Sequence, residues 1–171
     1  LLADTGRWSW GMMLQRRVRR TRPWTKAIVG APLEIRHNTR RVIRLLWFLF
    51  ALFVVYGTTI PFDFSIDADV VRQKLASLEL NPLVSGGRRV SIPDTFQNIL
   101  LFVPFGVLGS LAFLQMSASR ALALVGATLA STTLSVGVEA LQLFTTDRVT
   151  STADVLTNTV GGVLGALVVI G

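Results

Sequence analysis

The amino-acid sequence predicts an all-α integral membrane protein, a four-helix bundle preceded by an Arg-rich arm. Three observations lead to this fold class. Of the 171 residues, 51% are hydrophobic and 16% are charged, whereas a soluble domain carries about 25% charged residues. Four apolar stretches are long enough, at about 1.5 Å per helical residue, to cross or nearly cross a hydrocarbon core of about 30 Å. The basic residues are concentrated ahead of the first stretch.

The composition also excludes several kinds of site. The chain has no cysteine, which excludes a disulfide framework, a thiolate metal site and a cysteine nucleophile. The single histidine, His37, lies in a polar segment, which argues against histidine metal clusters and Ser/His triads. We therefore expect no cofactor and no enzymatic activity. Because the chain starts with Leu1 and stops inside an apolar run at Gly171, we expect the natural protein to extend beyond one or both ends.

Residues 1–41 are expected to form a cytoplasmic arm. Residues 1–44 hold 11 of the 17 Lys and Arg residues, and the remainder of the chain is slightly acidic. Three functions suit such a segment: an anchor on anionic lipid, worth about 1 kcal/mol per basic residue near the surface, a docking arm for another membrane-protein subunit, or a nucleic-acid-binding segment. Membrane tethering argues against nucleic acid, so the expected partners are membrane lipids and other subunits. The candidate docking residues are Arg16, Arg17, Arg19, Arg20 and Arg22.

The first membrane helix is predicted at about 42–60, with Arg44 and Trp47 near its start and Tyr56 near its end. The apolar stretch is too long for a cleaved signal peptide, and no small-residue cleavage site follows it, so we expect a retained helix. Because basic residues resist translocation, the 11 that precede this helix or open it place the N-terminus in the cytoplasm. The sequence therefore predicts a multi-pass protein of the cytoplasmic (inner) membrane.

The connection 61–93 is polar and is expected on the outer side. Within it, residues 67–80 place Val71, Leu75 and Leu78 on one helical face, with Asp67 as N-cap and a stop at Asn81. This short amphipathic helix either lies on the membrane surface or covers the end of the bundle. Residues 85–89 predict a turn.

Three further membrane helices are predicted at about 94–116, 121–144 and 151–171, which complete a transmembrane domain over residues 42–171. The joints between them are only a few residues long, so consecutive helices are expected to pack as antiparallel hairpins. This order places the 117–120 joint inside and the 145–153 joint outside.

Polar residues of these three helices are expected to meet near the outer surface. Asp94 with Asn98, and Asp154 with Asn158, are spaced i, i+4, and Glu139 with Gln142 is spaced i, i+3. Each pair therefore shares a helix face. A carboxylate in lipid needs a partner, and Arg148 in the 145–153 joint is the predicted partner of Glu139. The amides of Asn98 and Asn158 are expected to satisfy its remaining lone pairs.

Two interpretations of this polar cluster remain open. The residues either form structural hydrogen bonds between helices or bind a ligand or lipid headgroup. Catalysis by carboxylates is the least favoured alternative, and the helical spacing does not demand a divalent cation.

The glycine and proline motifs of the membrane helices indicate how the helices pack. Gly161, Gly162 and Gly165 contain a G-x-x-x-G pattern that allows another helix to approach closely. Pro104, followed by Gly106, is expected to kink the second helix or open its backbone hydrogen bonding.

The stretch from Asp94 to Gly165 resembles the VanZ-like family of bacterial membrane proteins. The resemblance covers about residues 45–171, and the Arg-rich arm lies outside it. It implies a small multi-helix membrane protein of the cell envelope, related to a namesake associated with glycopeptide (teicoplanin) resistance, and it supplies a fold and a polar site rather than a reaction. The matching elements are Asp94-x-x-x-Asn98, Phe102 to Gly106, Glu139-x-x-Gln142, Arg148, Asp154-x-x-x-Asn158, Gly161, Gly162, Gly165, and Tyr56 with Ile60 to Phe62.

Two functional hypotheses follow. The first is a binding protein whose outer polar cluster engages a lipid-linked or envelope ligand. The second is a non-catalytic accessory subunit of a larger membrane protein complex, docked through its arm and its Gly-rich helix faces.

Overall fold

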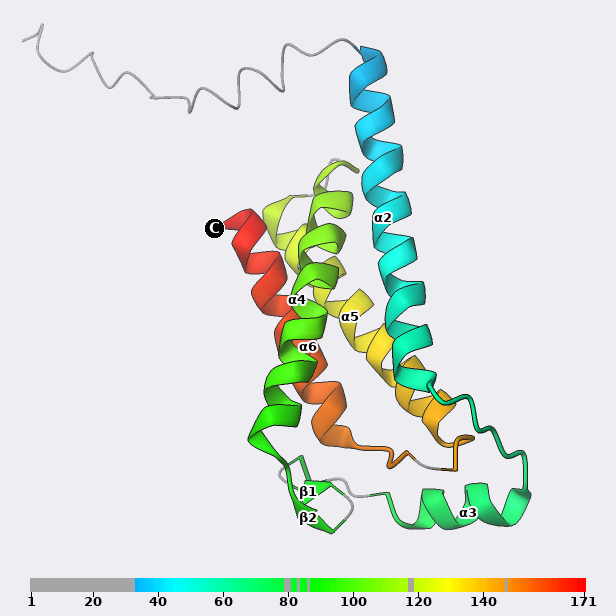
Figure 1. The fold of residues 1–171 in the computed structure, drawn as a ribbon. Helices are drawn as coiled ribbons and strands as arrows, with labels where there is room; N and C mark the ends of the chain where they lie inside the picture. Colours follow the sequence, from blue (N-terminus) through cyan, green and yellow to red (C-terminus); the bar gives the residue numbers. More distant parts are fainter. Residues whose placement is uncertain (1–32, 79–80, 83, 86, 117–118, 147) are drawn as a thin grey trace, which may run out of the picture. The chain divides into compact units, whose positions relative to one another are not determined.

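The structure, a computed structural model, describes residues 33–78, 81–82, 84–85, 87–116, 119–146 and 148–171. His37–Gly171 form one compact unit, which is the part described below. The five predicted arginines of the arm lie outside the described residues. The elements in chain order are helix α2 (Leu33–Thr59), helix α3 (Ala68–Ala76), strand β1 (Val84–Ser85), strand β2 (Arg88–Arg89), and helices α4 (Ile92–Leu114), α5 (Arg120–Gln142) and α6 (Thr152–Ile170) (Figure 1).

Four helices of the described chain are long and apolar enough to span a membrane, which confirms the predicted fold class. The spans are Asn38–Thr59, Ile92–Gln115, Arg120–Gln142 and Thr152–Ile170. The last three agree with the predicted helices to within about two residues. Helix α2 begins at Leu33 rather than near residue 42. The extra residues contain neither Gly nor Pro and include several good helix formers, so the basic segment next to the membrane continues the helix.

Helices α4 and α6 approach each other through glycine on both sides. A Cβ atom at Gly106 would collide with the backbone of Gly162, and one at Gly165 would collide with the backbone of Val103. Gly161 lies equally close to the carbonyl of Ile99. These glycines therefore pack within the chain, Gly161 and Gly165 against α4 and Gly162 against both α4 and α5.

Helix α5 joins the same bundle through small side chains. A Cβ atom at Gly162 would meet the Ser131 side chain, and the hydroxyls of Thr132 and Thr159 are 3.1 Å apart in a hydrogen bond. Helix α4 continues through Pro104. Because proline has no backbone N–H, the carbonyl four residues earlier loses its usual helical partner. The predicted kink stays a prediction.

Helix α2 packs through large side chains instead. The Trp47 ring lies against Gly109, with ring centroids 5.5 Å from Phe105 and 5.7 Å from Phe113. Val54 is buried in a core cluster with Phe102, Phe105 and Val138. The opposite side of α2 is exposed and apolar, as expected for a face that contacts lipid tails. Its exposed large residues are Val42, Leu45, Leu46, Phe48, Leu49, Leu52, Phe53 and Tyr56.

The connection between α2 and α4 carries two small elements. The predicted turn at 85–89 is an antiparallel hairpin in which Val84 pairs with Arg89 and Ser85 with Arg88. Gly87 adopts a positive φ of 74°, which glycine tolerates without steric cost. Asp67 caps α3 as predicted, by accepting a hydrogen bond from Asp69 N. Helix α3 ends at Ala76 rather than near residue 80.

Candidate functional site

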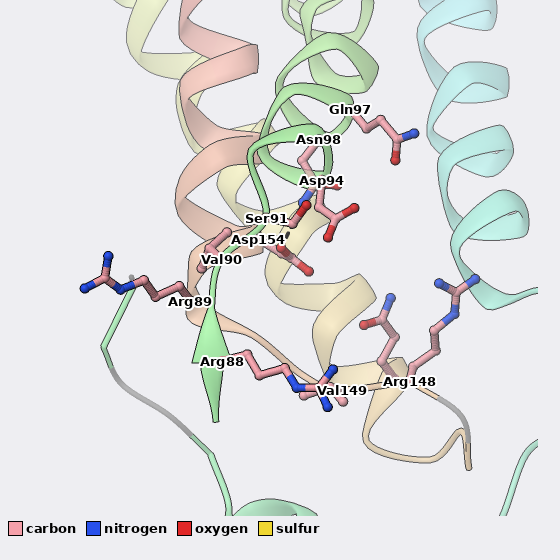
Figure 2. A pocket seen from close by; sticks show the side chains of 11 residues that line it. Arg88, Arg89, Val90, Ser91, Asp94, Gln97, Asn98, Arg148, Val149 and Asp154 are labelled. Carbon is pink, nitrogen blue, oxygen red and sulfur yellow. Dashed lines mark hydrogen bonds between the residues drawn. The ribbon is translucent and has the colours of Figure 1, made fainter. Parts of the chain in front are cut away.

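A polar pocket lies at the end of the bundle where α4 and α6 begin and α5 ends. It has a volume of about 570 Å³. Three arginines, two aspartates and three side-chain amides line most of it (Figure 2). The lining residues are Arg88, Arg89, Val90, Ser91, Asp94, Gln97, Asn98, Gln142, Arg148, Val149 and Asp154. Five of the seven residues of the predicted cluster are therefore in one pocket, and Glu139 and Asn158 do not line it.

The hairpin and α4 supply most of this lining because β2 runs almost directly into the helix. Ser91 is the N-cap of α4, but its side chain makes no capping hydrogen bond. Asp94 and Asn98 lie one turn apart on the helix face that turns towards the pocket, as their spacing predicted. Strand β2 places Arg88 at the pocket edge, with its side chain directed towards Val149 (Figure 2).

Asp154 contributes from α6 and is tied to α4. Its Oδ1 accepts a hydrogen bond of 2.8 Å from Asn98 Nδ2. The side chain is half-buried, in the first turn of α6, where a carboxylate also interacts favourably with the helix dipole. The predicted meeting of α4 and α6 polar groups thus exists, but the asparagine bonds Asp154 rather than Glu139.

Glu139 lies beneath the pocket and holds the start of α6. Its side chain is 5% exposed, and Oε2 accepts a 2.8 Å hydrogen bond from Ser151 N. Ser151 is the N-cap of α6, and its own hydroxyl accepts from Ala153 N. The first N–H groups of a helix have no partner within the helix, so a buried carboxylate next to them is satisfied by backbone donors. This explains why Glu139 needs no arginine.

The predicted Glu139–Arg148 pair is wrong. The Arg148 Nη2 atom instead donates to Ile60 O at 3.0 Å, directly after α2 ends. Within the described ranges, no ion pair joins Arg148 to a carboxylate. A guanidinium has five donor hydrogens, so Arg148 fastens the end of α2 and still presents donors to the pocket it lines.

The predicted contact between Asn158 and Glu139 is also wrong. Asn158 is 5% exposed and donates from Nδ2 to Ser135 Oγ at 2.8 Å. It therefore joins α6 to α5 deeper in the membrane, on the glycine side of α6 that packs inside the bundle. Its Oδ1 has no partner among the described residues. For Asn158 and Glu139, the interpretation as structural hydrogen bonds fits the geometry better than the ligand-binding one.

Lys74 of α3 is a structural residue that sequence reasoning missed. Its Nζ donates to the carbonyls of Gln142 at 3.1 Å and Arg148 at 2.8 Å, and also to that of Thr145. These carbonyls belong to the end of α5 and the joint that follows, where a cation compensates the helix dipole. Helix α3 is thus fixed across the end of the bundle, which favours the second of its two interpretations.

The segment after α2 strengthens the same region. Ser65 N donates to Phe144 O at 2.7 Å, and Thr146 N donates to Asp63 O at 3.1 Å. These bonds run antiparallel between the start of the long connection and the α5–α6 joint. No sequence pattern predicted these backbone hydrogen bonds, because the partners are about 80 residues apart in the chain.

The charged side chains of the pocket remain unpaired with one another. In the part of the chain that the structure describes, no ion pair joins Arg88, Arg89 or Arg148 to Asp94 or Asp154, although all five line the pocket. No group of three or more metal-ligating His, Cys, Asp or Glu side chains occurs there either. Arg88 and Arg89, which the sequence placed only in a predicted turn, and Gln97 were not among the predicted site residues. The hairpin turn next to Asp94 was the signal that could have placed the arginines.

Comparison with known proteins gives one match. A family model described as VanZ/LLP1 matches residues 46–170. No curated protein and no solved structure matched the chain. The matched range contains the whole pocket, all of α4, α5 and α6, and most of the membrane span of α2. The chain therefore belongs to the VanZ/LLP1 family, as a membrane protein with four spanning helices.

Proposed function

We propose that this VanZ-family protein binds a lipid-linked or envelope ligand in the polar pocket, at the outer surface of the bacterial cytoplasmic membrane. The observation that carries the proposal is a cavity of about 570 Å³ whose lining includes charges of both signs that do not pair with each other. Arg88, Asp94 and Arg148 are exposed, so their charged groups are accessible to a ligand. An open pocket of unpaired charges is suited to a ligand that supplies the missing partners.

The depth of the pocket supports a membrane-associated ligand. Asp94 and Asp154 lie in the first turns of α4 and α6, and Gln142 is the last residue of α5. All three therefore lie near the ends of membrane spans, where lipid headgroups meet the hydrocarbon core.

The distribution of basic residues supports an outer location. Arg40, Arg41 and Arg44 lie near the start of α2, whereas Ile60, just beyond the end of this helix, contacts Arg148 at the pocket. The pocket and these arginines are thus at opposite ends of a spanning helix. Since basic residues favour the cytoplasmic side, this distribution supports an outer position for the pocket and a cytoplasmic N-terminus.

We propose a non-catalytic role for the pocket. Its carboxylates, Asp94 and Asp154, each have a simpler function as helix N-terminal residues. The buried Glu139, which was the remaining candidate for carboxylate chemistry, is bonded to the backbone of Ser151. Binding accounts for the lining without a reaction.

Native mass spectrometry of the full chain, released from mild detergent, tests the binding proposal. We expect bound envelope lipids or lipid-linked species on the unaltered protein and their loss from an Arg88→Ala/Asp94→Ala double variant. The matched control is Arg72→Ala/Asp69→Ala, which removes exposed charges of the same types from α3. Equal retention of bound species by both double variants would overturn the proposal.

A resistance role, which the family resemblance implies, requires a separate test. Expression of the chain in a susceptible bacterium should lower teicoplanin susceptibility if the role applies, and the Arg88→Ala/Asp94→Ala variant should lose the effect at equal protein level. Unchanged susceptibility with the folded protein in the membrane would exclude this role without affecting ligand binding.

The accessory-subunit function remains a second proposal, supported by α2. The helix is less buried in the bundle than the other three spans and exposes a continuous apolar side. Gly161, Gly162 and Gly165 do not support it, because they pack within the chain. Purification in mild detergent distinguishes the cases: a stoichiometric complex contacting α2 or residues 1–41 supports the subunit role, and a monomer rejects it.

A further inference from the structure

We propose that the pocket selects a zwitterionic lipid headgroup, a phosphate joined by a short linker to a primary ammonium group. This inference rests on the proposed function and names the chemical class of its ligand. It follows from how the unpaired charges are arranged and how many hydrogen-bonding sites they leave free.

The charges are arranged in two groups. Arg88 comes from the hairpin and Arg148 from the α5–α6 joint, and both lie on the rim of the pocket beyond the helix ends (Figure 2). Asp94 and Asp154 lie together at the starts of α4 and α6, next to Asn98 (Figure 2). Arg89 points away from both groups (Figure 2). The pocket therefore has a cationic rim and an anionic wall.

Each group retains free hydrogen-bonding capacity. Arg148 uses one nitrogen on Ile60 O, and Arg88 has no side-chain partner among the described residues, so both guanidiniums can donate to phosphate oxygens in the bidentate geometry that arginine favours. On the anionic wall, Asp154 uses Oδ1 for Asn98, and Asp94 has no side-chain partner in the described chain. An ammonium group carries three donors and no acceptor, which matches a wall of two carboxylates.

Ligands with a single sign of charge fit less well. A purely anionic headgroup would satisfy the arginines but would lie next to Asp94 and Asp154, and like charges in one site repel. A purely cationic ligand would leave the arginines unpaired. A quaternary ammonium carries the positive charge but has no N–H to donate. A phosphate linked to a primary amine satisfies both groups at once.

Binding of defined lipids to the purified full chain tests the selection. The probes are phosphatidylethanolamine, phosphatidylcholine and phosphatidylglycerol with identical acyl chains, titrated in detergent and detected by native mass spectrometry. All three share the phosphate, whereas the first alone carries a primary ammonium. We expect phosphatidylethanolamine to bind about tenfold or more tightly than phosphatidylglycerol, since one hydrogen bond to a charged group is typically worth at least that factor.

Two variants separate the groups. Asp94→Asn should reduce the preference for phosphatidylethanolamine over phosphatidylglycerol towards equality while leaving phosphatidylglycerol bound. Arg88→Gln should weaken all three lipids by a similar factor and leave the preference intact. The matched controls Asp69→Asn and Arg72→Gln, on exposed positions of α3, should change neither quantity.

The outcomes distinguish this inference from the proposed function. If the three lipids bind equally, or phosphatidylglycerol binds best, the zwitterion proposal is wrong while a lipid-binding pocket stands. If no lipid binds the folded protein and no native ligand co-purifies, both fail. Soluble glycerophosphoethanolamine should compete with phosphatidylethanolamine; competition by inorganic phosphate as strong as this would show that the ammonium is not recognised and would also overturn the selection.

Discussion

The middle of the α4–α6 bundle and its polar end are built on opposite principles. In the middle, a Cβ atom at Gly106 would collide with the backbone of Gly162, one at Gly162 would collide with the Ser131 side chain of α5, and one at Gly165 would collide with the α4 backbone. At the polar end, charged side chains from four segments surround a cavity of about 570 Å³ and do not pair with one another. The middle therefore holds the fold, and the end is free to hold something else.

Between these two regions lies a layer of buried polar contacts. Glu139 binds the start of α6 through Ser151 N, and Asn158 joins α6 to α5 through Ser135. This layer resembles the glycine region in function, because it fixes one helix against another. The comparison teaches that a polar residue near a membrane surface is not by itself a sign of a binding site; its bonding partners decide.

Replacing Gly106 with Val should have the largest effect. The new side chain would meet the backbone of Gly162, which cannot rotate away, so the helices must separate. Overpacking costs 1–3 kcal/mol and occasionally more, and we expect about 3 kcal/mol or more here. The measurement is the amount of folded, monodisperse protein extracted in mild detergent and its thermal unfolding midpoint.

The matched control for this variant is Gly137→Ala. A Cβ atom at Gly137 meets no atom within 4 Å, so this change should leave the unfolding midpoint unchanged or slightly higher. A Gly106→Val protein as stable as Gly137→Ala would break the comparison, because the α4–α6 approach would then not hold the fold.

Replacing Glu139 with Ala should have the next largest effect. The change leaves Ser151 N–H buried without its acceptor, which costs about 1–3 kcal/mol of stability. Glu139→Gln keeps a side-chain oxygen at the same position and should recover most of that loss. Both are compared by thermal unfolding in the same detergent. A loss for Gln as large as the loss for Ala would show that the negative charge, rather than the acceptor, is what α6 requires.

Most of the fold could be predicted from the sequence because it depends on local patterns. Apolar stretches of spanning length, short joints and the glycine spacing at Gly161 and Gly165 each have one simple solution in a membrane. The cap at Asp67 and the turn at Gly87 follow from the same kind of local rule. The start of α2 was predicted too late because hydropathy marks the membrane span, whereas the helix continues into polar residues.

The residues that line the site were predicted in part, and their bonding partners were not. Helical spacing correctly brought Asp94, Asn98 and Asp154 to one place. It failed for the Glu139–Arg148 pair because sequence spacing counts side chains, and the actual partners are backbone atoms: Ser151 N for the carboxylate and Ile60 O for the guanidinium. Long-range backbone contacts of this kind have no signature in a single sequence.

Replacing Lys74 with Met should have a smaller effect, confined to the polar end. The ammonium group bonds carbonyls of the α5–α6 joint, and the side chain is partly exposed, so the expected loss of stability is about 1 kcal/mol. Hydrogen exchange should increase at residues 142–146 and on α3 but stay unchanged in the middle of α4 and α6. Arg72→Met is the matched control from the same helix. Equal exchange in both variants would show that α3 is not held by Lys74.

Replacing pocket charges should have the smallest effect on stability. This prediction tests most directly whether the polar end differs in function from the glycine-packed middle of the bundle. Arg88→Gln and Asp94→Asn remove exposed groups without a side-chain partner in the described chain. Each variant should therefore change the free energy of unfolding by no more than about 0.5 kcal/mol, as measured from its unfolding midpoint. The same variants should alter lipid binding, which Gly137→Ala should not. A residue that matters for binding and not for stability is positioned for a ligand. Asp94→Asn could instead destabilise the protein as strongly as Glu139→Ala. That result would show that Asp94 stabilises the bundle, and it would contradict a separate ligand-binding function for the pocket.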